Sequence, residues 1–145
     1  MFLVDVNLLV YTSNRNAPQH GAAKAWLEKR LVGHSQTLGL PWHSLLGFLR
    51  IVSNPRMYTS PVPVRTAWQQ VQRWLDAPAA WIPAPGRQHR FVVNDLIQIT
   101  QPAGTAVSDL HLAALAMENG LVLASADSDF GRIPGVRWVN PLAQR

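Results

Sequence analysis

The most informative hydrophobic pattern lies between Thr105 and Phe130, in the sequence TAVSDLHLAALAMENGLVLASADSDF. Apolar residues occupy most faces of a helix that would run to about Asn119, so this helix is expected to be buried on most sides. Gly120 suits the left-handed residue that ends a helix. The following run, LVLAS, is typical of a strand that is covered on both faces of a parallel sheet.

Acidic residues stand at both ends of this helix and strand. Ser108 is expected to cap the helix, and Asp109 in its first turn suits the positive end of the helix dipole. Asp127 and Asp129 come just after the strand. In open α/β sheets, ligands bind at the edge formed by the carboxyl ends of the strands.

The N-terminus repeats the same arrangement. The run FLV begins at Phe2 and is closed by Asp5, and Asn7 is able to cap the helical turn that follows. If this strand and the strand in LVLAS are parallel neighbours, the four aspartates at their ends converge on one edge of the sheet.

The rest of the chain alternates between short strand-like runs and amphipathic helices. The strand-like runs are QTLGL, AWIP and VRWVNPL, and the helices are AAKAWLEKRL, WHSLLGFLRIVSN after Pro41, VRTAWQQVQRWLD and RQHRFVVNDLIQIT. This alternation favours an α/β fold with a parallel sheet. Without a repeat or linker, residues 1–145 are expected to form a single domain.

Composition narrows the class of protein. Hydrophobic residues make up 48% of the chain and charged residues 14%, which indicates a well-packed globule. The absence of cysteine excludes a disulfide framework and a thiolate metal site. With no apolar run near 18 residues and no signal-like N-terminus, we expect a cytoplasmic protein without a membrane segment. The net charge of +5 points to a polyanionic partner, although its predominance of arginine also suits acidic protein partners.

Half of the eight acidic residues are the four aspartates described above, despite the positive net charge. Carboxylates crowded at one sheet edge repel one another, and an oxygen-only set of ligands suits a hard divalent cation such as Mg²⁺ or Mn²⁺. Such ions activate water for the hydrolysis of phosphodiesters. Arginine side chains around the site would hold the phosphate backbone of a nucleic acid.

Four segments together resemble a PIN-domain ribonuclease of the VapC toxin type. They are VDVNLLVY, LLGFLRIVSNPRM, VSDLHLAALAMENG with SADSDF, and VRWVNPL, and they cover nearly the whole chain in the family's order. The resemblance implies a three-layer α/β/α PIN-like domain with a short central parallel sheet. It also implies a Mg²⁺- or Mn²⁺-dependent endoribonuclease that cleaves structured RNA such as tRNA or rRNA, forms a homodimer and is neutralised by a cognate antitoxin.

The resemblance also assigns roles to individual aspartates. Asp5, Asp109 and Asp127 match the metal-binding and catalytic acids of the family, and Asp129 matches an additional acid in the same loop.

One position departs from the family pattern. Many members carry a Glu on the helix after the second strand, but this chain has no acidic residue between Glu28 and Asp76, and Gly47 takes the corresponding place. We therefore expect a site of three or four aspartates, and the missing Glu argues against a second metal ion more than against the first. Whether Asp95 compensates is left open.

Several basic residues are weaker candidates. Arg50 and Arg56 would bind RNA or the antitoxin, or would be ordinary surface arginines. His111 lies on the helix next to the site, where a structural or solvent-facing role is the better interpretation. His43 and His89 have less support still.

Two other functions remain as alternatives. A phosphatase of the haloacid dehalogenase type is suggested by the aspartate after the first strand, but its second acid would fall at Asn7, and no lysine partner is evident. A non-catalytic RNA-binding module whose aspartates hold a structural ion is the other alternative.

Overall fold

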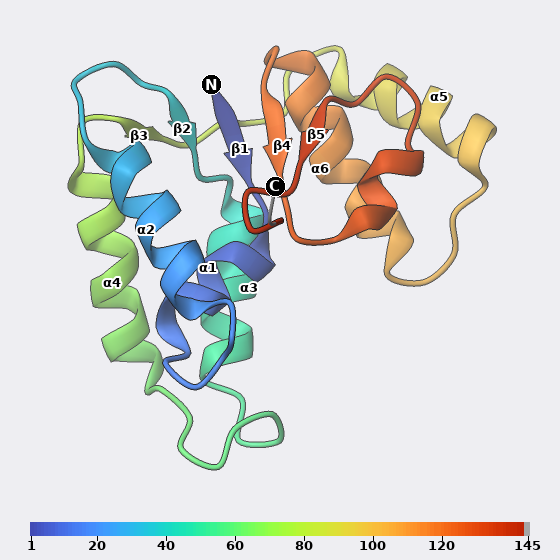
Figure 1. Cartoon of the computed structure of the whole chain (residues 1–145). Helices are drawn as coiled ribbons and strands as arrows, with labels where there is room; N and C mark the ends of the chain where they lie inside the picture. Colours follow the sequence, from blue (N-terminus) through green and yellow to red (C-terminus); the bar gives the residue numbers. More distant parts are fainter. Residues whose placement is uncertain (144–145) are drawn as a thin grey trace.

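The computed structural model describes residues 1–143 and contains a sheet of five short parallel strands. The strand order across the sheet is β3-β2-β1-β4-β5, so the first strand lies in the centre beside the fourth (Figure 1). The strands are β1 Phe2–Val4, β2 Leu38–Gly39, β3 Ala80–Trp81, β4 Val122–Ala124 and β5 Trp138–Val139. All five lie within the runs that the sequence predicted, and the expected α/β fold with a short parallel sheet is confirmed.

Six α-helices and one 3₁₀ helix connect the strands. They are α1 Val6–Ser13, α2 His20–Leu31, α3 Trp42–Val52, α4 Val64–Asp76, α5 His89–Thr100, α6 Ala106–Glu118 and the 3₁₀ helix η1 Ser128–Arg132. Within residues 1–143, none of the helices combines the length and the hydropathy that a bilayer-spanning segment requires.

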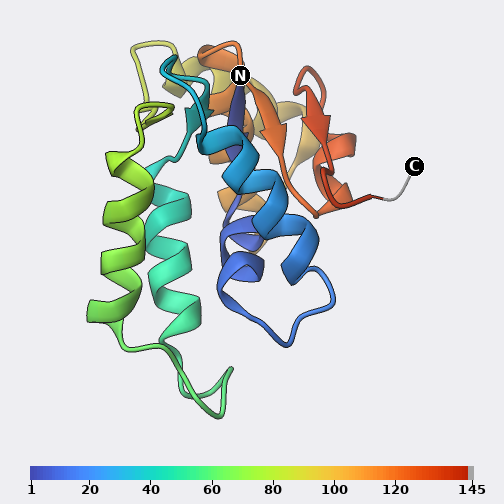
Figure 2. The ribbon, with the colours of Figure 1, turned by 60° about the vertical axis from the view of Figure 1, so that its left-hand side comes forward.

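Helices cover both faces of the sheet, which gives the expected three layers (Figures 1 and 2). Val4 packs into a core cluster built from α1, α2, α3 and α4, whereas its neighbour Leu3 packs on the other face against Leu112 and Leu115 of α6. Successive residues of a strand point to opposite faces, so each short strand contributes to both layers. The continuous apolar runs in the sequence reflect this two-sided burial.

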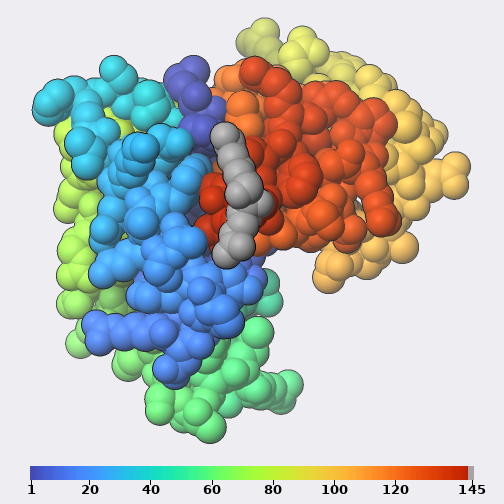
Figure 3. All heavy atoms as spheres, in the orientation of Figure 1, coloured from blue at the N-terminus to red at the C-terminus, as the bar shows by residue number. Residues whose placement is uncertain are grey.

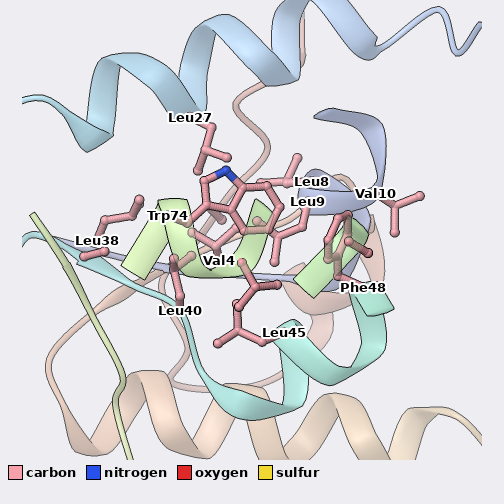
Figure 4. Close-up of a cluster of buried hydrophobic side chains, with 14 of the residues drawn as sticks. Val4, Leu8, Leu9, Val10, Leu27, Leu38, Leu40, Leu45, Phe48 and Trp74 are labelled. Carbon is pink, nitrogen blue, oxygen red and sulfur yellow. The ribbon is translucent and has the colours of Figure 1, made fainter. Parts of the chain in front are cut away.

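The larger core cluster is centred on aromatic side chains from α3 and α4. Trp74 lies among Val4, Leu8 and Leu27, and Phe48 packs beside it (Figure 4), with 4.9 Å between the two ring centroids. Aromatic rings at this separation combine large apolar burial with a favourable tilted geometry. The cluster therefore joins all four N-terminal helices to the central strand.

Helices α1 and α3 cross closely just beyond the carboxyl ends of the strands. Gly47 of α3 makes this approach possible, since a Cβ atom at this position would lie 2.8 Å from Val6 Cγ2. The buried Ser44 hydroxyl donates to the carbonyl oxygen of Val4 at 2.6 Å and fixes α3 to the end of β1. In the surface view, the outline is hollowed below the strand ends, between the α1–α3 part and the α6 part (Figure 3).

Two local expectations about α6 have different outcomes. Gly120 has a φ of 64° and ends the helix in the left-handed region, as predicted. The cap at Ser108 is wrong, because the N-cap residue is Thr105 and α6 begins at Ala106, three residues earlier than expected. Asp109 nevertheless remains in the first turn of the helix.

Candidate metal centre

Asp5 is placed by the pairing of the two central strands. Val4 of β1 is in register with Ala124 of β4, and the Asp5 N–H donates to the Ala124 carbonyl oxygen at 3.0 Å. Asp5 is also the N-cap residue of α1, with its Oδ1 accepting from the Val6 N–H at 2.7 Å. The prediction that these two strands are parallel neighbours is therefore confirmed.

Ser125 and Asn7 hold the Asp5 carboxylate in place. The buried Ser125 hydroxyl donates to Asp5 Oδ2 at 2.7 Å and accepts from Asn7 Nδ2 at 3.1 Å. Asn7 Oδ1 in turn accepts from the Ala126 N–H at 3.2 Å. The proposed capping role of Asn7 is wrong, because Asp5 caps α1 and the Asn7 side chain instead bridges α1 to the end of β4.

Ser125 is the functional residue that sequence reasoning missed. Its hydroxyl oxygen also accepts from the Asp127 N–H at 2.9 Å. One buried hydroxyl therefore contacts both the Asp5 carboxylate and the backbone of Asp127. The sequence does place a hydroxyl side chain at the end of an apolar strand. A buried polar group at such a position needs a hydrogen-bond partner, which could have pointed to Ser125.

Asp127 and Asp129 lie in the loop that follows β4. Asp127 is the N-cap residue of η1, and its Oδ1 accepts from the Asp129 N–H at 2.9 Å. Asp127 is half-buried and Asp129 is exposed. This turn contact uses Oδ1 of Asp127 and leaves Oδ2 for another partner.

Asp109 shows that the four carboxylates share one region. Its pKa is raised to about 6, first by burial and then by the negative charges of Asp5, Asp127 and Asp129. Each of those charges disfavours ionisation of Asp109, because like charges at short range raise one another's proton affinity. The four aspartates that the sequence singled out therefore lie close enough for the other three charges to act on Asp109.

The pKa of Asp5 is also raised, with burial as the largest cause. The hydrogen bonds from Ser125 and the Val6 N–H oppose this effect, as does the charge of His43, while Asp127 adds to it. A buried carboxylate that retains hydrogen-bond donors and faces other acids is a group that a cation would stabilise in its ionised form.

The donor set fits a hard divalent cation in its chemistry. Carboxylate oxygens are the preferred ligands of Mg²⁺ and Mn²⁺, and a cation would relieve the repulsion that raises the pKa of Asp109. Within residues 1–143, however, no three acidic or histidine side chains are grouped closely enough to hold an ion. The carboxylates act on one another through their charges at separations longer than those of shared metal ligands. A cation that binds here would therefore draw the carboxylate side chains together.

Three histidines lie next to the aspartates. The His43 ring on α3 is 5.7 Å from the His111 ring on α6, and His111 Nδ1 lies 3.0 Å from His89 Nε2. Burial is the first cause of a lowered pKa at His111, and the positive charges of His89 and His43 add to it. His111 is therefore hydrogen-bonded, in agreement with the structural interpretation, but it also joins a cluster whose extent the sequence did not indicate.

The other candidates lie away from the aspartates. Arg50 is in the last turn of α3, Arg56 is in the following loop, and Asp95 is on α5; all three are exposed. None of them is among the charges that affect the pKa values of Asp5 and Asp109. Asp95 therefore gives no sign of replacing the absent helix Glu. The space beside Gly47, where that Glu would stand, is occupied by the side chain of Val6.

Comparisons with known proteins agree with this arrangement. The family model described as "PIN domain" matches residues 2–136. The chain is 40% identical to "VapC ribonuclease Mb2897" of Mycobacterium bovis, covering 98% of this chain and 96% of that protein. It is 36% identical to "Ribonuclease VapC37" of Mycobacterium tuberculosis, covering 99% of each.

Two solved structures share the fold. One is VapBC2 from Rickettsia felis, bound to a DNA fragment from its promoter, with a TM-score of 0.69 and 17% identity over 96% of this chain and 97% of that chain. The other is FitAB bound to the IR36 DNA fragment, with a TM-score of 0.70 and 16% identity over 100% of this chain and 98% of that chain.

Proposed function

This chain belongs to the PIN-domain family, and on that premise we propose that it is a metal-dependent endoribonuclease, the toxin of a toxin–antitoxin system. The observation that carries the proposal is the raised pKa of Asp109, which is caused by burial and by the charges of Asp5, Asp127 and Asp129. The relatives that are 36% and 40% identical over nearly the whole chain are named as ribonucleases. The proposal takes residues 1–145 as one domain.

The metal is assigned to Mg²⁺ or Mn²⁺, with Asp5, Asp109 and Asp127 as the ligands and catalytic acids and Asp129 as a further ligand. When bound, the cation lowers the pKa of a water molecule and offsets charge on the phosphodiester. Ser125 and Asn7 keep the Asp5 carboxylate oriented through hydrogen bonds of 2.7 and 3.3 Å to Oδ2. Because α3 carries Gly47 where many relatives have an acid, we expect the aspartates to hold one cation.

The substrate is assigned to structured RNA, tRNA or rRNA. The net charge of +5, carried mostly by arginine, favours binding of a polyanionic substrate by the protein surface that surrounds the acidic centre. An RNA-cleaving toxin acts where RNA is abundant, so the proposal places the protein in the cytoplasm. Arg50 and Arg56 are exposed and are assigned to RNA or to the antitoxin.

A cognate antitoxin and a second copy of the chain are the proposed protein partners. The structural neighbours include VapBC and FitAB, which supports the antitoxin. Exposed apolar side chains, among them Trp42, Leu46 and Phe91, provide surface for such contacts.

The phosphatase alternative gains no support from the structure. Both lysines, Lys24 and Lys29, lie on α2, and neither is among the groups that act on Asp5. The non-catalytic RNA-binding module remains the alternative that an experiment must separate.

The test is cleavage of total RNA by the purified protein with Mn²⁺, with Mg²⁺ and with a chelator. Asp109→Asn is the inactive variant, and Asp95→Asn on α5 is a matched control that removes the same charge from an exposed position. We expect discrete fragments that require metal and Asp109 but not Asp95. Metal-independent binding of RNA without cleavage, unchanged in Asp109→Asn, would favour the non-catalytic module.

A further inference from the structure

A surface cavity of about 590 Å³ lies between α5 and α6. Its lining combines cationic or imidazole side chains with valines and includes no acidic residue. The side chains are those of Arg87, His89, Arg90, Val93, Val107 and His111. Its volume is in the range of pockets that bind small organic ligands.

The cavity is tied to the carboxylate region through α6 and α3. Val107 and His111 are one turn apart on the face of α6 that lines the cavity, and the His111 ring lies 5.7 Å from the ring of His43. The charge of His43 in turn lowers the pKa of Asp5. The cavity is therefore linked to Asp5 through His111 and His43.

A hydrogen-bonded chain fixes the orientation of His111. Glu118, whose side chain is 7% exposed, accepts from the Gly86 N–H at 2.7 Å through Oε1 and contacts His89 Nδ1 through Oε2. A carboxylate has no proton to give, so Nδ1 of His89 is the donor. His89 Nε2 lies 3.0 Å from Nδ1 of His111, so the two rings share one hydrogen bond.

His111 uses Nδ1 for the contact with His89, and its ring lines the cavity. Glu118 sets the orientation of this ring through His89, in the way that carboxylates orient imidazoles in other functional sites. A ring nitrogen held in this manner discriminates between groups that can hydrogen-bond to it and groups that cannot.

The charge at the cavity favours RNA as its occupant. Arg87 and Arg90 are exposed, and within the described part of the chain neither forms a salt bridge. Unpaired arginines bind phosphates well, and apolar walls accept a base that has left its stack. The ribose 2′-hydroxyl and the edges of bases carry hydrogen-bonding groups that a ring nitrogen of His111 can contact.

We propose that the cavity between α5 and α6 is a subsite for one nucleotide of the RNA substrate, adjacent to the bond that is cut. Arg87 and Arg90 bind its phosphates, Val93 and Val107 pack against its base, and His111 forms a hydrogen bond with the base edge or the 2′-hydroxyl. The subsite rests on the proposed ribonuclease function and adds the determinant of nucleotide preference.

The first test measures RNA binding without cleavage. The double variant Arg87→Gln/Arg90→Gln is compared with Arg65→Gln/Arg73→Gln, which removes two exposed arginines from α4. Binding of a labelled single-stranded oligoribonucleotide is followed by fluorescence anisotropy in chelator over a range of salt concentrations. We expect roughly tenfold weaker binding and a salt slope lower by about 1.4 for the α5 variant only, as for two lost phosphate contacts.

Equal effects of the two double variants would overturn the subsite. A weaker homodimer or weaker antitoxin binding in the α5 variant, with RNA binding and cleavage unchanged, would also overturn it and assign the cavity to a protein interface. If the wild-type protein cleaves no RNA with either metal, the proposed function itself fails. Cleavage by the wild type together with unaffected α5 variants removes only the subsite.

The second test reads nucleotide preference from the ends of the cleavage products. Val107→Trp, at a half-exposed position, fills the cavity, and Glu118→Gln replaces the carboxylate that contacts His89 with an amide. We expect both folded variants, checked by circular dichroism, to lose about tenfold of the preference at one nucleotide beside the cut, since the nucleotide loses either its space or its hydrogen bond to His111. An unchanged preference in folded Val107→Trp would overturn the proposal.

Discussion

Replacing Asp109 with Asn is expected to stabilise the metal-free protein while abolishing cleavage. The pKa of Asp109 rises from 3.8 to about 6 because of burial and of the charges of Asp5, Asp127 and Asp129. A shift of about two units corresponds to roughly 3 kcal/mol at 1.36 kcal/mol per unit. Because Asp109 is only half-buried, solvent screening reduces this to on the order of 1 kcal/mol.

The pH dependence gives the prediction its sign. A carboxyl group with a raised pKa in the folded state binds its proton more tightly there than in the unfolded chain, so protonation favours folding. This stability is fully present below about pH 4 and is lost as the pH rises through about 6. The wild type should therefore fall below Asp109→Asn in stability over this window, and the two should converge at low pH.

The assay is urea or thermal unfolding in chelator between pH 4 and pH 8. At pH 8, Asp109→Asn should melt about 3 °C above the wild type, as expected for about 1 kcal/mol in a domain of this size. Asp95→Asn, which makes the same change of charge on the exposed surface of α5, should show no such gain. A variant that is less stable than the wild type at pH 8, or a difference that does not change with pH, would refute the reasoning. Added Mn²⁺ should raise the melting temperature of the wild type more than that of Asp109→Asn.

Three further substitutions test the surroundings of the site. Ser125→Ala removes the 2.7 Å hydrogen bond to Asp5, so it should lower stability by about 1–3 kcal/mol and reduce metal-dependent cleavage; full activity would exclude Ser125 from positioning Asp5. Gly47→Ala places a Cβ atom 2.8 Å from Val6 and should cost about 1–3 kcal/mol in urea unfolding, and an unaltered midpoint would show that the α1–α3 contact is not tight. Gly120→Ala forces a left-handed φ of 64° on a residue with a side chain, and a loss of about 1 kcal/mol is expected; no change would contradict the strain argument.

Much of the fold was accessible from hydrophobic periodicity. The runs FLV, QTLGL, AWIP, LVLAS and VRWVNPL each contain a strand, because buried parallel strands need continuous apolar sequence. The helix boundaries were less accurate, as α6 begins at Ala106 instead of after Ser108. The first turn of a helix depends on local hydrogen bonds that compete closely with one another, so a cap residue alone does not fix where a helix starts.

The aspartates were also accessible from the sequence, since an acid directly after a buried parallel strand can only emerge at the carboxyl edge of the sheet. The roles of Asn7 and Ser125 were not, because their hydrogen bonds join residues more than one hundred positions apart. The same holds for Glu118, His89 and His111, whose hydrogen bonds depend on how α5 packs on α6.

The sequence by itself therefore determined which residues are buried, where strands end and which end in acids, because these follow from local periodicity and the chemistry of single side chains. Only the tertiary structure decided that β1 pairs with β4 and that three other carboxylates raise the pKa of Asp109. It also decided that the side chain of Val6 occupies the space beside Gly47. Those properties depend on distances between elements, and such distances are set by the packing of the whole core.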